Sequence, residues 1–298
     1  MTQKCGLVAV IGAPNAGKST LVNALVGQKV AIVSAKAQTT RARLLGIALA
    51  DEVQIVLADT PGIFAPRRRL DRAMVAAAWE GAEEADAILL VVDPGKQRRH
   101  ELEPLLETLK DRPERRILVL NKVDAVAKEP LLDLARELSE KVEFSEVFFV
   151  SALTGDGVAE LKAHLAGLMP EGAWLYPEDQ VSDASERLLA CEITREQLYR
   201  QLHDELPYDC AVRHEKYAQR KDGSLEVRQQ IVVARDSQKA IVLGKGGSRI
   251  KAIGEAARKE LAELLGQKVH LFLHVRVEEG WDDKARDIYE EMGLEWQR

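Results

Sequence analysis

The chain has 298 residues, of which 46% are hydrophobic and 30% are charged, and its formal net charge is -6. This length exceeds one typical domain, so we expect two domains that each bury a core. The acidic balance excludes binding to nucleic acid or anionic lipid through overall charge, so such binding needs a local basic patch. The N-terminus shows no signal-peptide pattern and no segment approaches a membrane span, which predicts a cytoplasmic protein.

Residues 1–170 alternate short apolar segments with helical patterns. The apolar segments are GLVAVIG, VQIVLAD, DAILLVVD, RRILVLN and EVFFVSA, and the helical patterns lie around 18–27, 69–84, 99–111, 130–141 and 157–168. Strands that are apolar throughout and separated by helices are typical of an α/β domain with a mainly parallel sheet. Right-handed crossovers place the strand ends, and therefore a ligand site, along one edge of that sheet.

The pattern changes after residue 170. The segment MPEGAWLYPEDQVSD (169–183) carries two prolines, a glycine and several acidic residues and has no periodicity, which predicts a linker over 171–183. Residues 184–298 then show a long helix (184–205), two strand segments joined at Asp222-Gly223, a helical segment to Leu243, the loop GKGG, a helix (248–265) and a final strand. The Asp-Gly pair is a strong hairpin signal. This order predicts a second, smaller α+β domain.

The segment GAPNAGKS (12–19) fits the phosphate-loop pattern G-x-x-x-x-G-K-[ST], with a strand before it and a helix after it. Its glycines let backbone N–H groups turn inward, and the helix adds the positive end of its dipole. Lys18 is predicted to reach the β- and γ-phosphates and Ser19 to ligate Mg²⁺. A glycine-rich turn that only begins a helix is the disfavoured alternative. The predicted phosphate contacts come from Gly12, Ala13, Pro14, Asn15, Ala16, Gly17, Lys18, Ser19 and Thr20.

Two further segments predict that the base is guanine. NKVD (121–124) follows a predicted strand, and Asp124 can accept hydrogen bonds from the guanine N1–H and 2-amino groups. SAL (151–153) ends the next strand, where the Ala152 N–H is predicted to donate to guanine O6. NKxD also occurs as an ordinary loop, but here both segments end successive strands after a phosphate loop. The predicted base contacts come from Asn121, Lys122, Asp124, Ser151, Ala152 and Leu153, with the stem of Lys122 covering the face of the base.

DTPG (59–62) and KAQTTRAR (36–43) predict the groups that sense the third phosphate. Asp59 is expected to support Mg²⁺ through a water, and the Gly62 N–H to meet the γ-phosphate. Thr40, which we favour over Thr39, is expected to close over Mg²⁺ only when that phosphate is present. Two ordinary surface threonines remain the alternative. The predicted metal ligands are therefore Ser19, Thr40 and Asp59, and the predicted catalytic groups are Lys18, Thr40 and Gly62.

The motifs GAPNAGKST, KAQTTRAR, DTPG and NKVD resemble the translation-factor-type GTPases, and with the second half they are similar to the Era family of bacterial ribosome-assembly GTPases. Ile63 stands where other GTPases carry a water-orienting glutamine, so slow intrinsic hydrolysis is expected. The basic triplet of Arg67, Arg68 and Arg69 favours a solvated face over an arginine finger. In several relatives an asparagine at the position of Asn15 ligates a monovalent cation, which predicts K⁺ there; a role in bracing the loop stays open.

IVLGKGGSRIKAIG (241–254) places a GxxG loop between two helical segments, which resembles the KH RNA-binding domain in its bacterial version. Glycines there let a nucleic-acid backbone approach closely, and about four nucleotides are clamped across the loop. GxxG alone could be a helix–helix corner, but the hairpin and final strand occur in the KH order. The predicted RNA contacts come from Lys239, Gly244, Lys245, Gly246, Gly247, Arg249 and Lys251.

The resemblance implies a switch that hydrolyses GTP to GDP and phosphate with Mg²⁺. It also implies binding to small-subunit ribosomal RNA near its 3′ end, during assembly of the small ribosomal subunit. The alternative is a constitutive RNA-binding protein in which nucleotide only stabilises the first domain; the predicted γ-phosphate sensors favour the switch. We expect a monomer. Some relatives contact the inner face of the membrane peripherally, but no basic amphipathic helix here supports such a contact.

Overall fold

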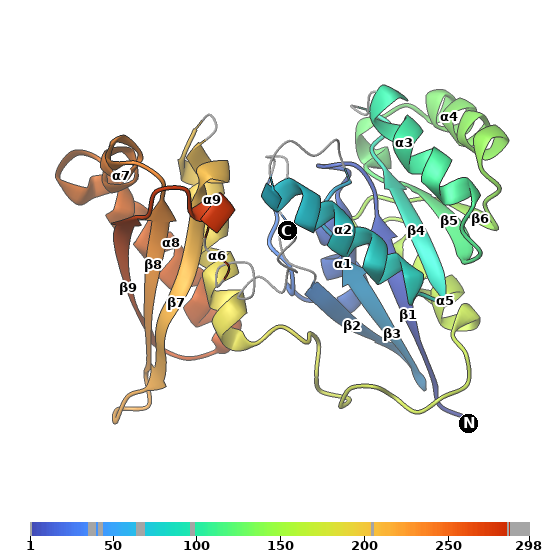
Figure 1. The fold of residues 1–298 in the computed structure, drawn as a ribbon. Coiled ribbons are helices and arrows are strands. Elements are labelled where there is room, and N and C mark those ends of the chain that lie inside the picture. Colours follow the sequence, from blue (N-terminus) through green and yellow to red (C-terminus); the bar gives the residue numbers. More distant parts are fainter. Residues whose placement is uncertain are drawn as a thin grey trace. The chain divides into compact units, whose positions relative to one another are not determined.

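The computed structural model describes residues 2–34, 40, 44–63, 69–95, 99–203, 206–284 and 286. Its contacts divide the chain into two compact units, Met1–Ala184 and Ser185–Arg298 (Figure 1). Among the described residues, no helix combines the length and the apolar character needed to cross a membrane.

The first unit contains a six-stranded sheet in the order β2-β3-β1-β4-β5-β6. Neighbouring strands are parallel except for β2 and β3, which are antiparallel. The mainly parallel sheet confirms the predicted fold class. The strands are β1 (Lys4–Ile11), β2 (Leu44–Ala50), β3 (Val53–Asp59), β4 (Ala87–Val92), β5 (Arg115–Leu120) and β6 (Glu146–Phe149).

Strand β2 was missing from the sequence-based prediction. It pairs with β3 through the tight turn at Asp51 and Glu52, where Asp51 has a φ of 50°. A two-residue hairpin turn with positive φ usually contains glycine or asparagine, and neither is present here. The turn signal was therefore absent from the sequence although the hairpin forms.

Helices cover both faces of this sheet (Figure 1). On one face, Leu21 and Leu161 join the strand residues in a buried cluster, and on the other face Leu106 and Leu138 do so. The helices of the first face are α1 (Lys18–Val26) and α5 (Val158–Leu168); those of the second are α2 (Arg69–Glu83), α3 (Arg99–Lys110) and α4 (Lys128–Lys141). Burial on both faces explains the continuous apolar strands, and it places the loops that follow β1, β3, β5 and β6 at one edge.

The segment 171–183, which the sequence predicted as a linker, is hydrogen-bonded to the first unit. The buried Gln54 side chain donates to the carbonyl of Tyr176 (2.9 Å) and accepts from the N–H groups of Leu175 (2.9 Å) and Tyr176 (3.0 Å). Farther along, the Leu45 N–H donates to the Asp183 carboxylate at 2.9 Å. The Leu45 bond satisfies a backbone group of β2, the edge strand, that would otherwise be exposed.

The second unit contains a three-stranded sheet in the order β7-β8-β9. Strands β7 (Cys210–Gln219) and β8 (Leu225–Val233) form an antiparallel hairpin, and β9 (Val269–Val277) is parallel to β8. The predicted turn is present: Gly223 has a φ of 78°, and the Arg220 N–H donates to the carbonyl of Ser224 at 2.8 Å. This unit is the α+β domain that the sequence predicted.

Helices α6 (Glu186–Gln201), α7 (Asp236–Leu243) and α8 (Ser248–Leu265) pack on one face of the second sheet. The Ser185 side chain caps α6 by accepting from the Leu188 N–H at 3.2 Å. The buried indole of Trp281 donates to the carbonyl of Asp209 at 3.2 Å, so the short helix α9 (Trp281–Lys284) packs back on this unit.

Candidate functional site

The predicted phosphate loop connects β1 to α1 with a tightly curled backbone. The φ angles are positive at Gly12 (155°), Asn15 (65°) and Gly17 (93°). A Cβ atom on Gly12 would lie 2.3 Å from the carbonyl oxygen of Val91, and one on Gly17 would lie 2.2 Å from the Asn121 amide nitrogen. These two positions therefore require glycine. The curled loop leads into the first turn of α1, and the free N–H groups of such a turn can bind an anion.

Lys18 is buried at the centre of this loop. Its Nζ donates to the carbonyl oxygens of Gly12 (3.2 Å) and Ala13 (3.1 Å). Burial lowers the pKa of Lys18 to about 8, and the nearby Asp59 carboxylate partly opposes this shift. A buried ammonium with a lowered pKa gains most from a strong anion beside it, so the loop is suited to hold phosphate.

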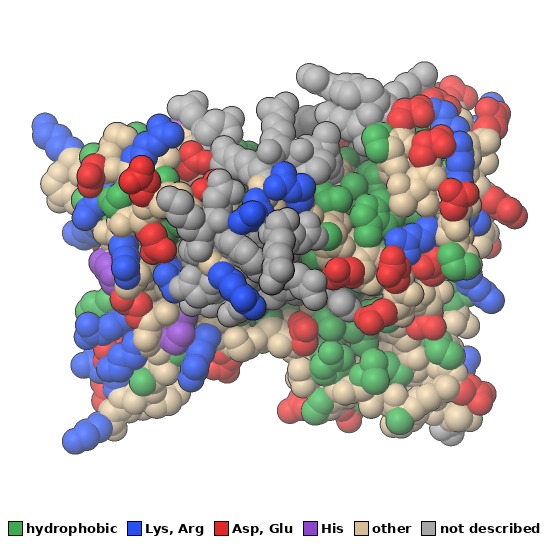
Figure 2. Space-filling model, viewed as in Figure 1, with side chains coloured by type: hydrophobic (Ala, Val, Ile, Leu, Met, Phe, Trp, Pro, Cys, Tyr) green, Lys and Arg blue, Asp and Glu red, His purple; other side chains and the backbone are tan. Residues whose placement is uncertain are grey.

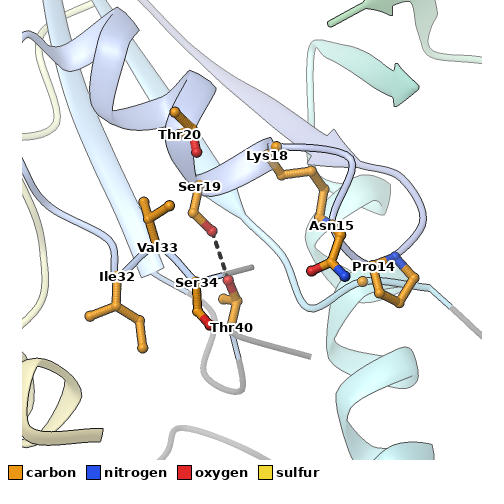
Figure 3. A pocket seen from close by; sticks show the side chains of 11 residues that line it. Pro14, Asn15, Lys18, Ser19, Thr20, Ile32, Val33, Ser34 and Thr40 are labelled. Carbon is orange, nitrogen blue, oxygen red and sulfur yellow. Dashed lines mark hydrogen bonds between the residues drawn. The ribbon is translucent and has the colours of Figure 1, made fainter. Parts of the chain in front are cut away.

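Three predicted metal ligands from distant parts of the sequence, Ser19, Thr40 and Asp59, come together beside Lys18. Figure 3 shows the first two of them. The hydroxyl oxygens of Ser19 and Thr40 are 2.8 Å apart, and the Ser19 and Thr40 hydroxyls donate to Asp59 Oδ2 at 2.7 and 3.2 Å. Two hydroxyls and one carboxylate form the hard oxygen donor set that Mg²⁺ prefers, so these residues fit the ion. The alternative threonine, Thr39, lies outside the described residues.

The DTPG segment packs directly against the phosphate loop. The Thr60 hydroxyl donates to the carbonyl of Val10 at 2.8 Å, and a Cβ atom on Gly62 would lie 2.8 Å from the Pro14 nitrogen. The next residue, Ile63, donates its N–H to the Gly12 carbonyl at 3.1 Å and buries its side chain in the apolar cluster beneath α2. The side chain at the glutamine position is therefore part of the core, where it cannot hold a water.

A cleft beside the phosphate loop is lined partly by a segment that the sequence did not mark. Asn23 of α1 fixes this segment by accepting from the N–H groups of Val30 and Ala31 (both 2.9 Å) and donating to the Ala31 carbonyl (2.8 Å). The sequence carried only a weak signal for this role of Asn23, because a lone asparagine within a helix can have many other roles. The cleft is lined by Pro14, Asn15, Gly17, Lys18, Ser19, Thr20, Ile32, Val33, Ser34, Thr40 and Gly62.

The buried Asn121 side chain ties together two of the predicted nucleotide loops. Its amide nitrogen donates to the Ala16 carbonyl (3.0 Å), and its amide oxygen accepts from the Ala152 N–H (3.0 Å). Sequence reasoning assigned both Asn121 and the Ala152 N–H to guanine alone and missed this connection. In this structure the Ala152 N–H is hydrogen-bonded to Asn121, which fixes the SAL loop relative to the phosphate loop.

Lys122 contacts two groups of the protein that were not expected from the sequence. Its ammonium donates to the Asn15 carbonyl at 2.6 Å and to the Asp93 carboxylate at 2.7 Å. Asp93 follows β4, is buried and also accepts from the Gly95 N–H at 2.9 Å. The aspartate that ends DAILLVVD was a signal, because it lies at the ligand edge. This pair holds Lys122 in place and leaves Asp124, in the short helix η1 (Val123–Ala125), exposed beside it.

The remaining predicted base residues form a compact loop. The buried Ser151 side chain accepts from the Thr154 N–H at 3.2 Å, and the Val123 N–H donates to the Val150 carbonyl at 3.2 Å. Leu153, by contrast, is 81% exposed. The NKVD and SAL loops are thus joined directly through their backbones, whereas the Leu153 side chain is available to a ligand.

The GxxG loop of the second unit forms the short helix η3 (Lys245–Gly247) between α7 and α8. A Cβ atom on Gly244 would lie 2.8 Å from the Arg249 Cβ, whereas Gly246 and Gly247 have positive φ and open space around them. Lys245 and Lys251 are exposed, Lys239 is half-buried, and the Arg249 guanidinium donates to the Ile241 carbonyl at 2.9 Å. The structure therefore brings the predicted RNA residues together, with Arg249 partly engaged in holding α7.

A P-loop fold with Mg²⁺-type oxygens and guanine-type loops, followed by a KH-type unit, defines a guanine-nucleotide-binding protein with an RNA-binding domain. The comparisons agree. A family profile described as "50S ribosome-binding GTPase" matches residues 7–122, and one described as "KH domain" matches residues 205–282. The "GTPase Era" of Erythrobacter litoralis is 75% identical over 299 residues, which cover 99% of this chain and 98% of that protein.

Other similar proteins lead to the same family. The "GTPase Era" of Agrobacterium fabrum is 56% identical and covers 99% of this chain and 93% of its own length. A solved structure described as "Era in complex with MgGDPNP and nucleotides 1506-1542 of 16S ribosomal RNA" has a TM-score of 0.92 at 38% identity, with 98% of this chain and 99% of that chain covered. A second, of a single-substitution variant of Aquifex aeolicus Era "bound to GDP.AlF4-", has the same TM-score and identity. This chain belongs to the Era family of GTPases.

Proposed function

We propose that this protein is a GTP-hydrolysing switch that binds small-subunit ribosomal RNA near its 3′ end and acts in assembly of the small ribosomal subunit. The convergence of Ser19, Thr40 and Asp59 beside the buried Lys18 carries the switch part of this proposal. The RNA part is supported by the KH-type unit and by the relative that was crystallised with nucleotides of 16S ribosomal RNA.

The chain's own groups can divide the work of phosphoryl transfer. The phosphate-loop N–H groups and Lys18 bind and orient the triphosphate, and the Gly62 N–H is assigned to the γ-phosphate. Ser19, Thr40 and Asp59 would hold Mg²⁺, which supplies positive charge to the β- and γ-phosphates. Thr40 comes from a segment separate from the phosphate loop, and we assign it the role of sensing the third phosphate.

The guanine pocket is assigned to the NKVD and SAL loops. Asp124 accepts from the N1–H and 2-amino groups, and the stem of Lys122 covers the face of the base. The anchoring of Lys122 to Asp93 and Asn15 supports this assignment, because it fixes the position of the lysine beside Asp124. Asn121 has both amide ends bonded within the protein, so its main contribution is to hold these loops in register.

We also propose that Asn15 ligates K⁺ during hydrolysis. Ile63 is buried in the core and cannot orient water, so hydrolysis needs another group near the phosphates, and a bound cation would supply one. The Asn15 side chain lines the cleft beside Lys18 (Figure 3). Hydrolysis should be faster in K⁺ than in Na⁺ at equal ionic strength, and Asn15→Ala should remove the difference. Equal rates in both salts would reject the cation and leave Asn15 as a brace of the loop.

The central experiment compares RNA affinity in two nucleotide states. The probe is the fragment of 16S ribosomal RNA crystallised with the relative, and its affinity is measured with GDP and with a non-hydrolysable GTP analogue. A switch predicts a difference between the two states that Thr40→Ala removes, whereas Thr154→Ala, a threonine on the SAL loop, should retain it. Identical affinities in both states would favour the alternative, a constitutive RNA-binding protein. Association with the small ribosomal subunit is then checked by co-sedimentation.

A further inference from the structure

The outward face of the second sheet carries a row of planar side chains. Helices α6, α7 and α8 pack on the other face, where Ile231, Val233 and Val275 are buried. Side chains alternate along a strand, so the intervening residues of β9 point away from these helices. The outward row of β9 is His270, Phe272, His274 and Arg276.

The centre of this row is an aromatic ring stacked with a guanidinium group. Phe272 is 47% exposed, and the Arg228 guanidinium lies 5.0 Å from the centre of its ring. The strand register places Arg228 opposite Phe272 on one side and opposite Lys216 on the other. The register also places Arg213 opposite Gln230, and Gln230 opposite His274.

Cations exceed acidic groups on this face. The outward cations are Arg213, Lys216, Arg228 and Arg276, and the acids near them are Glu215, Glu226 and, just after β9, Glu278. Glu226 accepts from Lys216 (3.0 Å) and Arg228 (2.8 Å), which holds these two cations around the ring. Glu278, just after β9, is 3.7 Å from Arg213 and 3.9 Å from Arg276, which is farther than Glu226 lies from its two cations.

The basic surface extends to the ends of the strands. Arg220 and Lys221 are exposed at the hairpin turn beside the exposed Asp222, and Lys268 is exposed just before β9. Figure 2 shows Lys and Arg side chains gathered over these strands. This local excess contrasts with a chain whose net charge is -6. The positive charge of this surface complements a phosphate backbone. A single exposed aromatic ring offers too little apolar area for a stable protein interface.

We propose that the outward face of β7, β8 and β9 is a second binding surface for single-stranded RNA. Bases stack on Phe272 and on the neighbouring imidazoles, and Arg213 and Arg276 contact the phosphates. This inference rests on the proposed RNA-binding function. It places a second contact on the side of the sheet opposite to α7, the GxxG loop and α8, so one strand of RNA that passes around the edge strand β9 can contact both surfaces.

Two substitutions at Phe272 test the stacking. Phe272→Leu keeps an apolar side chain but removes the ring, whereas Phe272→Tyr keeps the ring. The probe is a synthetic RNA of nucleotides 1506–1542 of 16S ribosomal RNA, measured by fluorescence anisotropy. We expect the Leu variant to bind roughly 5- to 100-fold more weakly and the Tyr variant within about twofold of the unchanged protein. GDP affinity and the circular dichroism spectrum should be unchanged in both variants.

Arg276→Ala tests the phosphate contact, with Lys259→Ala on α8 as the matched loss of an exposed cation. Arg276→Ala should weaken binding and reduce the slope of log affinity against log salt by about 0.7, as expected for one contact with a single strand. Lys259→Ala should change neither quantity. If Phe272→Leu and Arg276→Ala both bind with the affinity and salt slope of the unchanged protein, this face does not bind RNA.

The GxxG variant Lys245→Asp/Gly246→Asp separates this inference from the proposed function. Loss of binding in this variant, with Phe272→Leu unaffected, overturns the second surface and supports the GxxG site. The reverse result supports the second surface and rejects the GxxG site. Loss in both supports both surfaces, and loss in neither rejects both.

Discussion

At the scale of single residues, the site depends on buried polar groups that are hydrogen-bonded within the protein. Lys18, Asp59, Asp93 and Asn121 are all nearly inaccessible to solvent, and each is hydrogen-bonded to a neighbouring loop. Burying polar groups without partners is costly, so these contacts fix the loops in one arrangement. The same contacts orient the donors of the proposed nucleotide site.

The lowered pKa of Lys18 predicts how nucleotide affinity depends on pH. The pKa of Lys18 in the free protein is about 8, well below its usual 10.5, whereas bound phosphate keeps the lysine charged. Binding above pH 8 must therefore take up a proton, and GDP affinity should fall by up to tenfold per pH unit. Affinity below pH 8 should stay nearly constant.

Isothermal titration calorimetry in two buffers of different ionisation enthalpy counts the protons taken up between about pH 7 and pH 9, on either side of the lowered pKa. Uptake should rise from near zero towards one proton per GDP. The absence of uptake at the upper pH would show that Lys18 is still charged in the free protein.

The same depressed pKa makes the ligand-free fold gradually lose stability as pH falls from 10.5 to about 8, because the unfolded state binds the extra proton first.

Asp124→Asn should change the preferred base from guanine to xanthine. The exposed carboxylate accepts two hydrogen bonds from guanine in the proposed pocket, whereas an amide can donate to the 2-oxo group of xanthine. We expect GDP affinity to fall roughly 100-fold and XDP affinity to rise. Competition between labelled GDP and XDP measures the preference, with Asp156→Asn on the SAL loop as the control. An unchanged preference for GDP would remove the pocket assignment.

At the scale of elements, α6 differs most from a simple amphipathic helix. Residues from Ala190 to Tyr199 are buried throughout, and they include a charged pair formed by Glu192 and Arg195. The Arg195 side chain is 1% exposed, its Nε donates to Glu192 at 2.9 Å, and the Glu192 carboxylate raises the pKa of Arg195 against the effect of burial. Such a pair adds little stability when intact, but its loss leaves a buried charge without its counter-ion.

Glu192→Gln should therefore destabilise the second unit by about 3–5 kcal/mol. Glu255→Gln, an exposed substitution on α8, should change stability by less than about 0.5 kcal/mol. Urea unfolding followed by circular dichroism gives both values. A loss below about 1 kcal/mol for Glu192→Gln would mean that the buried guanidinium is adequately stabilised by its other neighbours.

At the scale of the whole molecule, the two units carry different chemistry and are joined by a chain segment that belongs structurally to the first. All the proposed nucleotide contacts lie in Met1–Ala184, and the proposed RNA contacts lie in Ser185–Arg298. The segment between them is fastened to β3 by Gln54 and to β2 through Leu45, which is close in sequence to Thr40.

Gln54→Leu should release this segment from the sheet. The substitution removes three hydrogen bonds to residues 175 and 176, and we expect a loss of about 2–4 kcal/mol. Limited proteolysis should cut within 171–183 faster than in the unchanged protein. Gln28→Leu, at an exposed position after α1, is the control and should leave the cleavage rate unchanged. Equal cleavage rates in the two variants would show that Gln54 does not hold the segment.

The sequence alone determined the parts whose chemistry lies in short contiguous segments. GAPNAGKS, DTPG, NKVD and GKGG each need particular residues within a few positions, because the local backbone must curl around a phosphate, an ion or a base. The strands and helices of the first unit followed from burial on both faces of a parallel sheet. The hairpin of the second unit followed from one Asp-Gly turn, whereas the Asp51-Glu52 hairpin carried no such signal.

The tertiary structure alone decided which distant residues support those segments. Asp93 meets Lys122, Asn121 bridges Ala16 and Ala152, and Asn23 fixes the segment that lines the cleft. The row of His270, Phe272, His274 and Arg276 can be read in the sequence, but only the packing of α6, α7 and α8 shows that it faces outward. These relations were hidden because a strand's alternation does not say which face is covered, and a side-chain hydrogen bond leaves no periodic trace in the sequence.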